Sequence, residues 1–140
     1  MRNRAMATAL ILVLSIAISA SGADKFVLDQ AHSSIGFSVR HLVISKTKGS
    51  FHDAVATVMY DDKDITKSSV DVTIKIASID TDNEGRDNHL KSPDFFDVEK
   101  FPDMTFKSKR IEKVKDGYVA IGDFTIRDVT KEIKLPFQIV

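Results

Sequence analysis

Hydrophobic residues fall at every second position in several stretches of this 140-residue chain. Residues 70–76 read VDVTIKI, and residues 35–39 repeat the pattern as IGFSV. A side-chain period of two belongs to a β-strand that buries one face and exposes the other. This alternation constrains the fold more than any other feature, and it predicts a protein built from sheets.

The rest of the chain supplies more strands and few helical signals. Further strands are predicted at residues 25–29, 51–60, 104–111, 118–126 and 132–139, with a tight hairpin turn at Asp116-Gly117. The predicted strands do not alternate with helices as they would in βαβ units. We therefore predict one all-β domain with short helices, an antiparallel sandwich or barrel.

The interval 80–103 is too long for a structureless loop in a compact domain. Thr81 and Glu84 have the spacing of a capping box, which predicts a short helix from residue 82. Ser92 followed by Pro93 predicts the start of a second short helix. We expect this helical pair to lie across one end or side of the β-structure.

The first residues predict an export signal. Residues 5–20 are almost wholly apolar, follow Arg2 and Arg4, and are too few to cross a bilayer comfortably. Small residues at Ser21 and Ala23 suit a signal peptidase. We predict a signal peptide at 1–23, a β-domain at 24–140 and a periplasmic location.

The charge and the cysteine content exclude two classes of function. Removing residues 1–23 takes away two of the 20 basic side chains and none of the 20 acidic ones, so the charge stays nearly balanced. This balance predicts no nucleic-acid partner. The chain has no cysteine, so packing alone holds the fold and thiol chemistry is excluded.

Asp87, His89, Asp94 and Asp97 are the candidates for catalysis because they lie close together in the sequence. No G-x-S-x-G elbow or comparable nucleophile context accompanies them. A structural role is favoured: Asp94 caps a helix, while Asp87 and Arg86 tie that helix to neighbouring backbone or to each other. We predict no catalytic residue and no enzymatic activity.

The histidines and acidic loops do not have the spacing of a metal site. His32, His41, His52 and His89 are scattered, and the Asp62–Asp64 segment lacks the glycine and terminal glutamate of a calcium loop. We predict no metal and no other cofactor.

Phenylalanine dominates the aromatic residues, with nine Phe and no Trp. Each one suits a packed core, but together they suit the apolar interior of a barrel that a long hydrocarbon can occupy. The predicted ligand-binding residues are Ile35, Phe37, Val39, Phe51, Val70, Val72, Ile74, Ile76, Phe95, Phe96, Phe106, Phe124 and Ile126.

Four blocks of sequence resemble the YceI-like family: LDQAHSSIGFSVRHL (28–42), GSF (49–51), RDNHLKSPDFFDVEKFPDMTFKS (86–108) and GDFTIRDVTKEIKL (122–135). The resemblance implies an exported, lipocalin-like antiparallel β-barrel that binds polyisoprenoid lipids, including the tails of isoprenoid quinones. It implies neither enzymatic activity nor a metal. It also implies that residues 86–97 form a lid packed on the barrel, with phenylalanines facing a dry interior.

The same resemblance implies that chains of this family continue beyond residue 140, so we expect a truncated barrel, incomplete or open at its C-terminal edge.

The sequence leaves three hypotheses for the function. The first is a periplasmic carrier of a polyisoprenoid chain, which pairs with itself or transiently contacts a membrane protein. The alternative is a solidly packed β-module that recruits a partner strand through its open edge. The third is an exported hydrolase that uses Asp87 and His89.

Overall fold

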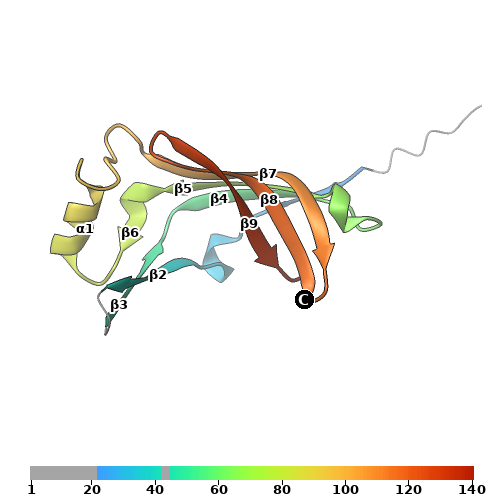
Figure 1. Cartoon of the computed structure of the whole chain (residues 1–140), viewed down its shortest axis with the longest axis horizontal. Helices are drawn as coiled ribbons and strands as arrows, with labels where there is room; N and C mark the ends of the chain where they lie inside the picture. Colours follow the sequence, from blue (N-terminus) through green and yellow to red (C-terminus); the bar gives the residue numbers. More distant parts are fainter. Residues whose placement is uncertain (1–21, 42–44) are drawn as a thin grey trace, which may run out of the picture.

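The computed structural model describes residues 22–41 and 45–140, apart from the side chains of His41 and Ser45 (Figure 1). The predicted signal peptide falls outside these residues except for its last two positions. Among the described residues, no helix has both the length and the apolar character that a bilayer crossing needs.

Two antiparallel sheets make up most of the protein, in agreement with the predicted class. The larger sheet has the strand order β1 (Asp24–Val27), β4 (Ala54–Tyr60), β5 (Ser69–Lys75), β7 (Asp103–Val114), β8 (Gly117–Ile126) and β9 (Val129–Phe137). The smaller sheet has the order β2 (Ile35–His41), β3 (Ser45–Phe51) and β6 (Ile79–Asp80). The helical elements are η1 (Gln30–His32), η2 (Ile65–Lys67), η3 (Ile76–Ser78) and α1 (Glu84–Lys91).

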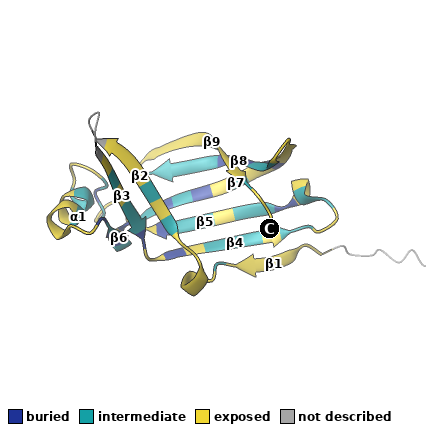
Figure 2. Ribbon diagram, turned by 90° about the horizontal axis from the view of Figure 1, so that it is seen from below, coloured by how far each residue is buried: buried dark blue, intermediate teal, exposed yellow. Residues whose placement is uncertain are grey.

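The sheets do not close into a barrel among the described strands, as expected for an open form. Strands β1 and β9 are the two edges of the larger sheet. The hairpin of β2 and β3 lies across one face of that sheet, near the end that carries α1 (Figures 1 and 2). The molecule therefore has a covered end beside α1 and a less covered end at the turn between β7 and β8.

The strand predictions were right where the alternation is strong and wrong where it is absent. Residues 35–39 lie in β2, and residues 70–75 lie in β5. The predicted strand 51–60 was wrong at its start, because Phe51 ends β3 and the chain turns before β4 begins. Strand β3, with the sequence SKTKGSF, has no alternation of its own and forms by pairing along the full length of β2.

Two clusters of buried side chains form the core. The first contains Phe51, Ala54, Ile74, Ile76, Ile79 and Met104, and it lies under the β2–β3 hairpin and the α1 region. The second contains Phe106, Ile111 and Ala120 and lies farther along β7 and β8. The strands that run between these clusters connect a tightly filled end to the end that carries the pocket described below.

Helix α1 begins at Glu84, two positions later than the capping box predicted. Asn83 is the N-cap of α1, and its Oδ1 accepts a hydrogen bond from the Arg86 N–H at 2.8 Å. Thr81 does not cap the helix: its hydroxyl donates to the Asp87 carboxylate, and its oxygen accepts a hydrogen bond from Arg86 Nε at 2.7 Å. Asp87 and Arg86 both bind Thr81, which confirms the predicted tie between the helix and the neighbouring backbone.

The predicted second helix was wrong. Ser92 is the C-cap of α1, and turns follow it. The Ser92 carbonyl accepts hydrogen bonds from the N–H groups of Phe95 at 3.0 Å and Asp97 at 2.9 Å, which folds the segment back on itself. Asp94 lies in these turns, with a carboxylate oxygen 3.5 Å from His89 Nε2, so it does not cap a helix.

Arg127, in the turn between β8 and β9, holds the segment after α1 in place. Its Nη1 donates to the Phe95 carbonyl at 2.9 Å, its Nη2 lies 3.7 Å from the Asp97 carboxylate, and its guanidinium lies 5.4 Å from the centre of the Phe101 ring. The Asp97 side chain is 6% exposed, so removal of the Arg127 guanidinium would leave a buried carboxylate with less positive charge beside it.

We expect Arg127→Ala to lower the free energy of unfolding by about 1–2 kcal/mol, because it removes these contacts together. Urea denaturation measures the change. Arg110→Ala is the control, since the exposed Arg110 side chain pairs with the equally exposed Glu112, and we expect a change within about 0.5 kcal/mol. Equal losses in the two variants would show that Arg127 does not anchor the segment.

Candidate functional site

The larger sheet surrounds an apolar pocket of about 630 Å³. All six strands of that sheet contribute to its lining, including both edge strands, so the sheet must curve around the space. The lining residues are Phe26, Val58, Tyr60, Ile65, Ser68, Ser69, Val70, Val72, Phe106, Ile111, Ala120, Leu135, Pro136, Phe137 and Ile139.

The pocket lining contains no charged side chain, and its polar residues are Ser68, Ser69 and the tyrosine Tyr60. Ser68 is already engaged, because its Oγ accepts a hydrogen bond from the Asp61 N–H at 2.9 Å. A ligand in this pocket therefore gains little from hydrogen bonds or ion pairs. The pocket suits a hydrocarbon chain.

The mouth of the pocket carries exposed apolar side chains. Phe26 is 55% exposed, Leu135 42% and Ile139 50%, and all three line the pocket. Phe26 also packs edge-on against Tyr60, with ring centres 5.9 Å apart. Apolar side chains that are both pocket-lining and solvent-exposed mark the route by which a hydrophobic molecule can enter.

A β-bulge brings two residues of β7 into the same pocket. Phe106 and Ile111 are an odd number of positions apart, so a regular strand would place them on opposite faces. The register between β7 and β8 shifts between Ser108 and Arg110, which restores Ile111 to the face of Phe106. The bulge explains why simple alternation does not find Ile111.

Three of the thirteen predicted ligand-binding residues line the pocket: Val70, Val72 and Phe106. The structure places the other ten elsewhere. Phe51, Ile74 and Ile76 are buried in the first core cluster, and Ile35, Phe37, Phe96, Phe124 and Ile126 pack against it. Val39 is 56% exposed and Phe95 is 47% exposed.

The reason is that the inward face of the sheet is filled at one end. The β2–β3 hairpin and the segment after α1 supply side chains that pack against the core cluster to which Ile74 and Ile76 belong. Phe95 does not face a dry interior as the lid hypothesis expected, because its ring stacks edge-on against His89 near the surface, with ring centres 4.8 Å apart. An inward-facing side chain of the sheet therefore packs in the core at the α1 end and lines the pocket at the other end.

The sequence interpretation missed most of the lining. Val58 and Tyr60 had no clear signal, because the β4 sequence AVATVMY is apolar on both faces. Leu135, Phe137 and Ile139 had a usable signal, because they occupy every second position from the end of β9 into the residues that follow it. Ile65 had no such signal, since it lies in the short η2 helix.

Asp87 and His89, the pair of the hydrolase hypothesis, have separate partners. The Asp87 carboxylate accepts a hydrogen bond from the Thr81 N–H at 3.0 Å. His89 contacts Asp94 and Phe95. Each of the two side chains thus has its own local structural contacts.

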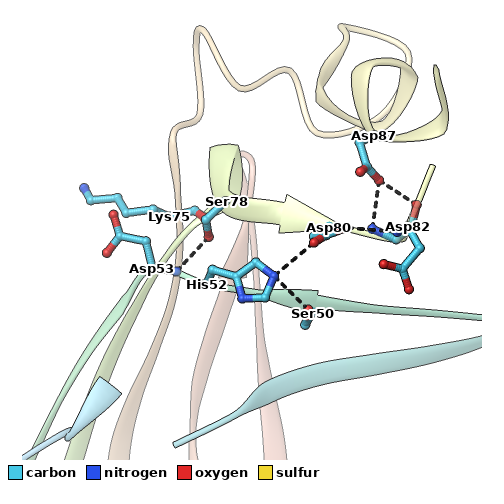
Figure 3. Close-up of polar contacts among 9 residues, drawn as sticks. Ser50, His52, Asp53, Lys75, Ser78, Asp80, Asp82 and Asp87 are labelled. Atoms are coloured by element: carbon cyan, nitrogen blue, oxygen red, sulfur yellow. Dashed lines mark hydrogen bonds and ion pairs between the residues drawn. The ribbon is translucent and has the colours of Figure 1, made fainter. Parts of the chain in front are cut away.

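A second polar cluster joins the turn after β3 to β6 (Figure 3). His52 Nε2 lies 3.2 Å from Asp80 Oδ2 and 3.3 Å from Ser50 Oγ. Both contacts use the same ring nitrogen, whereas a Ser-His-Asp triad uses different nitrogens for the serine and the carboxylate. Within residues 22–41 and 45–140, no group of three or more His, Asp or Glu side chains is arranged to hold a metal ion.

The pKa of Asp80 is lowered from its ordinary value, first by a hydrogen bond from the Asp82 N–H and next by the contact with His52. A lowered pKa means that the ionised carboxylate stabilises the fold above the pKa of the unfolded chain, about 4, and that this contribution disappears as the pH falls through the folded value. We therefore expect Asp80→Asn to flatten the loss of thermal stability below pH 4. Asp62→Asn controls for the loss of one negative charge, and a wild-type acid profile in Asp80→Asn would contradict the assignment.

Comparison with known proteins gives a consistent picture. The YceI-like domain matches residues 26–140. A UPF0312 protein of Photorhabdus laumondii is 38% identical over 134 residues, which is 96% of this chain and 69% of that protein. A UPF0312 protein of Staphylococcus aureus is 43% identical over 108 residues, 77% of this chain and 61% of the relative. The chain thus spans less than two thirds of the length of the Staphylococcus relative.

Solved structures show the same fold. Burkholderia cenocepacia BcnA has a TM-score of 0.75 at 26% identity, with 80% of this chain and 70% of that chain covered. The Campylobacter jejuni YceI protein has a TM-score of 0.61 at 45% identity, with 76% of this chain and 63% of that chain covered. The larger part of each neighbour's chain therefore has a counterpart in the fold described above.

Proposed function

The chain belongs to the YceI-like domain family, and we propose on this basis that it is an exported carrier that holds a polyisoprenoid chain in its apolar pocket. The observation that supports the proposal is the pocket of about 630 Å³ without a charged residue in its lining. This volume lies within the range of about 300–1,000 Å³ that is usual for small-molecule sites.

The hydrophobic effect supplies the binding energy. Each CH₂ group moved out of water contributes about 0.8 kcal/mol, so ten carbons contribute roughly 8 kcal/mol before the cost of ordering the chain. A prenyl chain needs no charged partner, and the lining offers none. Affinity in such a site depends on how much of the chain the pocket covers.

The proposal includes no catalytic step. Asp87 and His89 are engaged in contacts that stabilise the α1 region, and the predicted signal peptide supports a periplasmic location. Self-association and hand-over to a membrane protein stay predictions. The pocket supports the carrier over the alternative of a solidly packed β-module, because that module requires a filled interior.

Titration with N-phenyl-1-naphthylamine, a neutral probe that fluoresces in apolar sites, tests the proposal. We expect saturable binding and displacement of the probe by a C15 prenyl alcohol. A C5 prenyl alcohol is the control, since it has the same head and buries far less hydrocarbon, and we expect displacement only at concentrations at least a hundredfold higher. Equal potency of the two alcohols, or no saturable binding, would contradict a hydrocarbon-binding pocket.

A further inference from the structure

One rim of the apolar pocket exposes apolar side chains to solvent. Leu135 and Ile139 line the pocket and are exposed. Val114, the last residue of β7, is 43% exposed and borders a second hollow that shares Pro136 and Phe137 with the pocket. Single exposed apolar residues are common on protein surfaces, but several gathered at one opening mark a contact site.

Strand pairing and one hydrogen bond bring these side chains to the same surface. Strands β7, β8 and β9 are neighbours in the larger sheet. At the β7–β8 turn they curve away from the rest of that sheet, at the end of the molecule opposite α1 (Figure 1). Gln138 Nε2 donates to the Asp116 carbonyl at 3.0 Å, which holds the residues after β9 against the turn.

Three lysines accompany these apolar residues. Lys113 and Lys115 flank Val114, and Lys134 precedes Leu135. All three lysines are exposed, and none has an ion-pair partner among the residues that the structure describes. Their ammonium groups are therefore available to an external negative charge.

Most acidic side chains of the same strands are already paired with other cations. Glu112 lies 3.0 Å from Arg110 Nε, and the carboxylates of Asp123 and Glu132 lie 2.8 and 3.3 Å from Lys109 Nζ. At the β7–β8 turn this leaves Asp116 against the three lysines. The turn and the end of β9 thus carry a local excess of positive charge, 3 − 1 = 2.

The connection between β4 and β5, on another flank of the pocket, is acidic. Asp61 accepts hydrogen bonds from the N–H groups of Lys63 and Asp64 at 3.0 and 2.9 Å, and Asp64 accepts one from the Thr66 N–H at 3.1 Å. These two carboxylates bind their own loop, while Asp62 is exposed. Attraction to negative charge is thus confined to the flank formed by β7 and β9.

We propose that this flank docks the protein on an anionic lipid bilayer. The docking surface consists of Lys113, Val114, Lys115, Lys134, Leu135 and Ile139. Apolar side chains that enter the headgroup region, next to lysines that bind anionic lipid, are the combination that holds a protein at such an interface. The pocket would then open towards the bilayer, so a hydrophobic cargo need not cross water. The inference goes beyond the carrier function, because docking requires no cargo.

The chain has no tryptophan, so one introduced indole can report docking by its fluorescence. We expect the emission of Val114→Trp to shift to shorter wavelength when vesicles of phosphatidylglycerol and phosphatidylcholine in equal parts are added. Val39→Trp is the matched control, since Val39 is an exposed valine of β2 that lines neither hollow, and its emission should not shift. Equal shifts in the two variants, or no shift in Val114→Trp, would overturn the docking surface.

Vesicle co-sedimentation of a triple variant tests the lysines. We expect Lys113→Gln/Lys115→Gln/Lys134→Gln to bind the anionic vesicles about a hundredfold more weakly than the wild type, because each lysine at an anionic surface contributes roughly fivefold. The control Lys46→Gln/Lys48→Gln/Lys107→Gln removes the same charge from exposed positions away from the turn, and we expect a change within about threefold because salt screens distant charges.

All these proteins begin at Asp24, because the apolar residues 5–20 can bind vesicles themselves, and residues 24–140 contain every strand and helix described above. Equal losses in the two triple variants, or equal wild-type affinity for vesicles of pure phosphatidylcholine, would overturn an anionic partner. Titration with N-phenyl-1-naphthylamine in the absence of vesicles separates the two proposals. A wild type that binds the probe and ignores the vesicles keeps the carrier function and loses the docking surface.

Discussion

Replacing Val58 by tryptophan is expected to lower the affinity for N-phenyl-1-naphthylamine or a C15 prenyl alcohol by about tenfold or more. Val58 lies in the middle of β4, is half-buried, and lines the pocket. An indole at this position occupies volume that the ligand needs, and the pocket gives it room without a clash in the packed core. The measurement is the fluorescence titration described above, repeated on the variant.

Met59→Trp is the matched control for this substitution. Met59 is the next residue of β4, is 37% exposed, and does not line the pocket. The same large side chain is thus added to the opposite face of the same strand. We expect this variant to bind like the wild type, and a similar loss of affinity in both variants would mean that the site lies elsewhere.

Replacing Gly122 by alanine is expected to lower the free energy of unfolding by about 2–4 kcal/mol. An added Cβ would contact the carbonyl oxygen of Lys107 and lie 2.7 Å from the Cα of Ser108. These are backbone atoms beside the β7 bulge, so no side chain can rotate away to make room. Relief of the contact requires β7 and β8 to separate, which also disturbs Ile111 in the pocket.

Gly85→Ala is the control for Gly122. Gly85 lies in the exposed first turn of α1, where an added Cβ would meet its nearest neighbour, Asn83 Oδ1, at 3.6 Å. Alanine in a helix is favoured over glycine, so we expect stability to rise by up to about 1 kcal/mol. Urea denaturation gives both values. A loss at Gly122 below about 0.5 kcal/mol would show that the bulge relaxes easily.

The class of fold was predictable because the strongest signal in the chain is local. Side chains in residues 35–39 and 70–76 alternate, and residues 35–39 and 70–75 lie in strands β2 and β5. Strand β3 was not predictable in this way, since its polar sequence becomes a strand only by pairing with β2. The turn conformation after α1 likewise depends on Arg127, which is distant in sequence and supplies donors to that segment.

The site was less predictable than the fold. Alternation tells which side chains face inward, and Ile74 and Phe106 both do. It does not tell which part of the interior other segments fill. Ile74 is covered by the hairpin and the α1 region, whereas Phe106 borders open space. That difference is set by the long-range placement of β2 and β3, which no local pattern reports.

Methyl NMR of the protein with a bound C15 prenyl alcohol tests the central claim most directly. With isotope-labelled Val and Ile methyl groups, we predict nuclear Overhauser effects from the prenyl methyl groups to Val58, Val72 and Ile111, which line the pocket. We predict none to Ile76 and Ile79, which are buried in the first core cluster. Contacts to that cluster, or no contact with the pocket residues at a saturating concentration of the alcohol, would contradict the account.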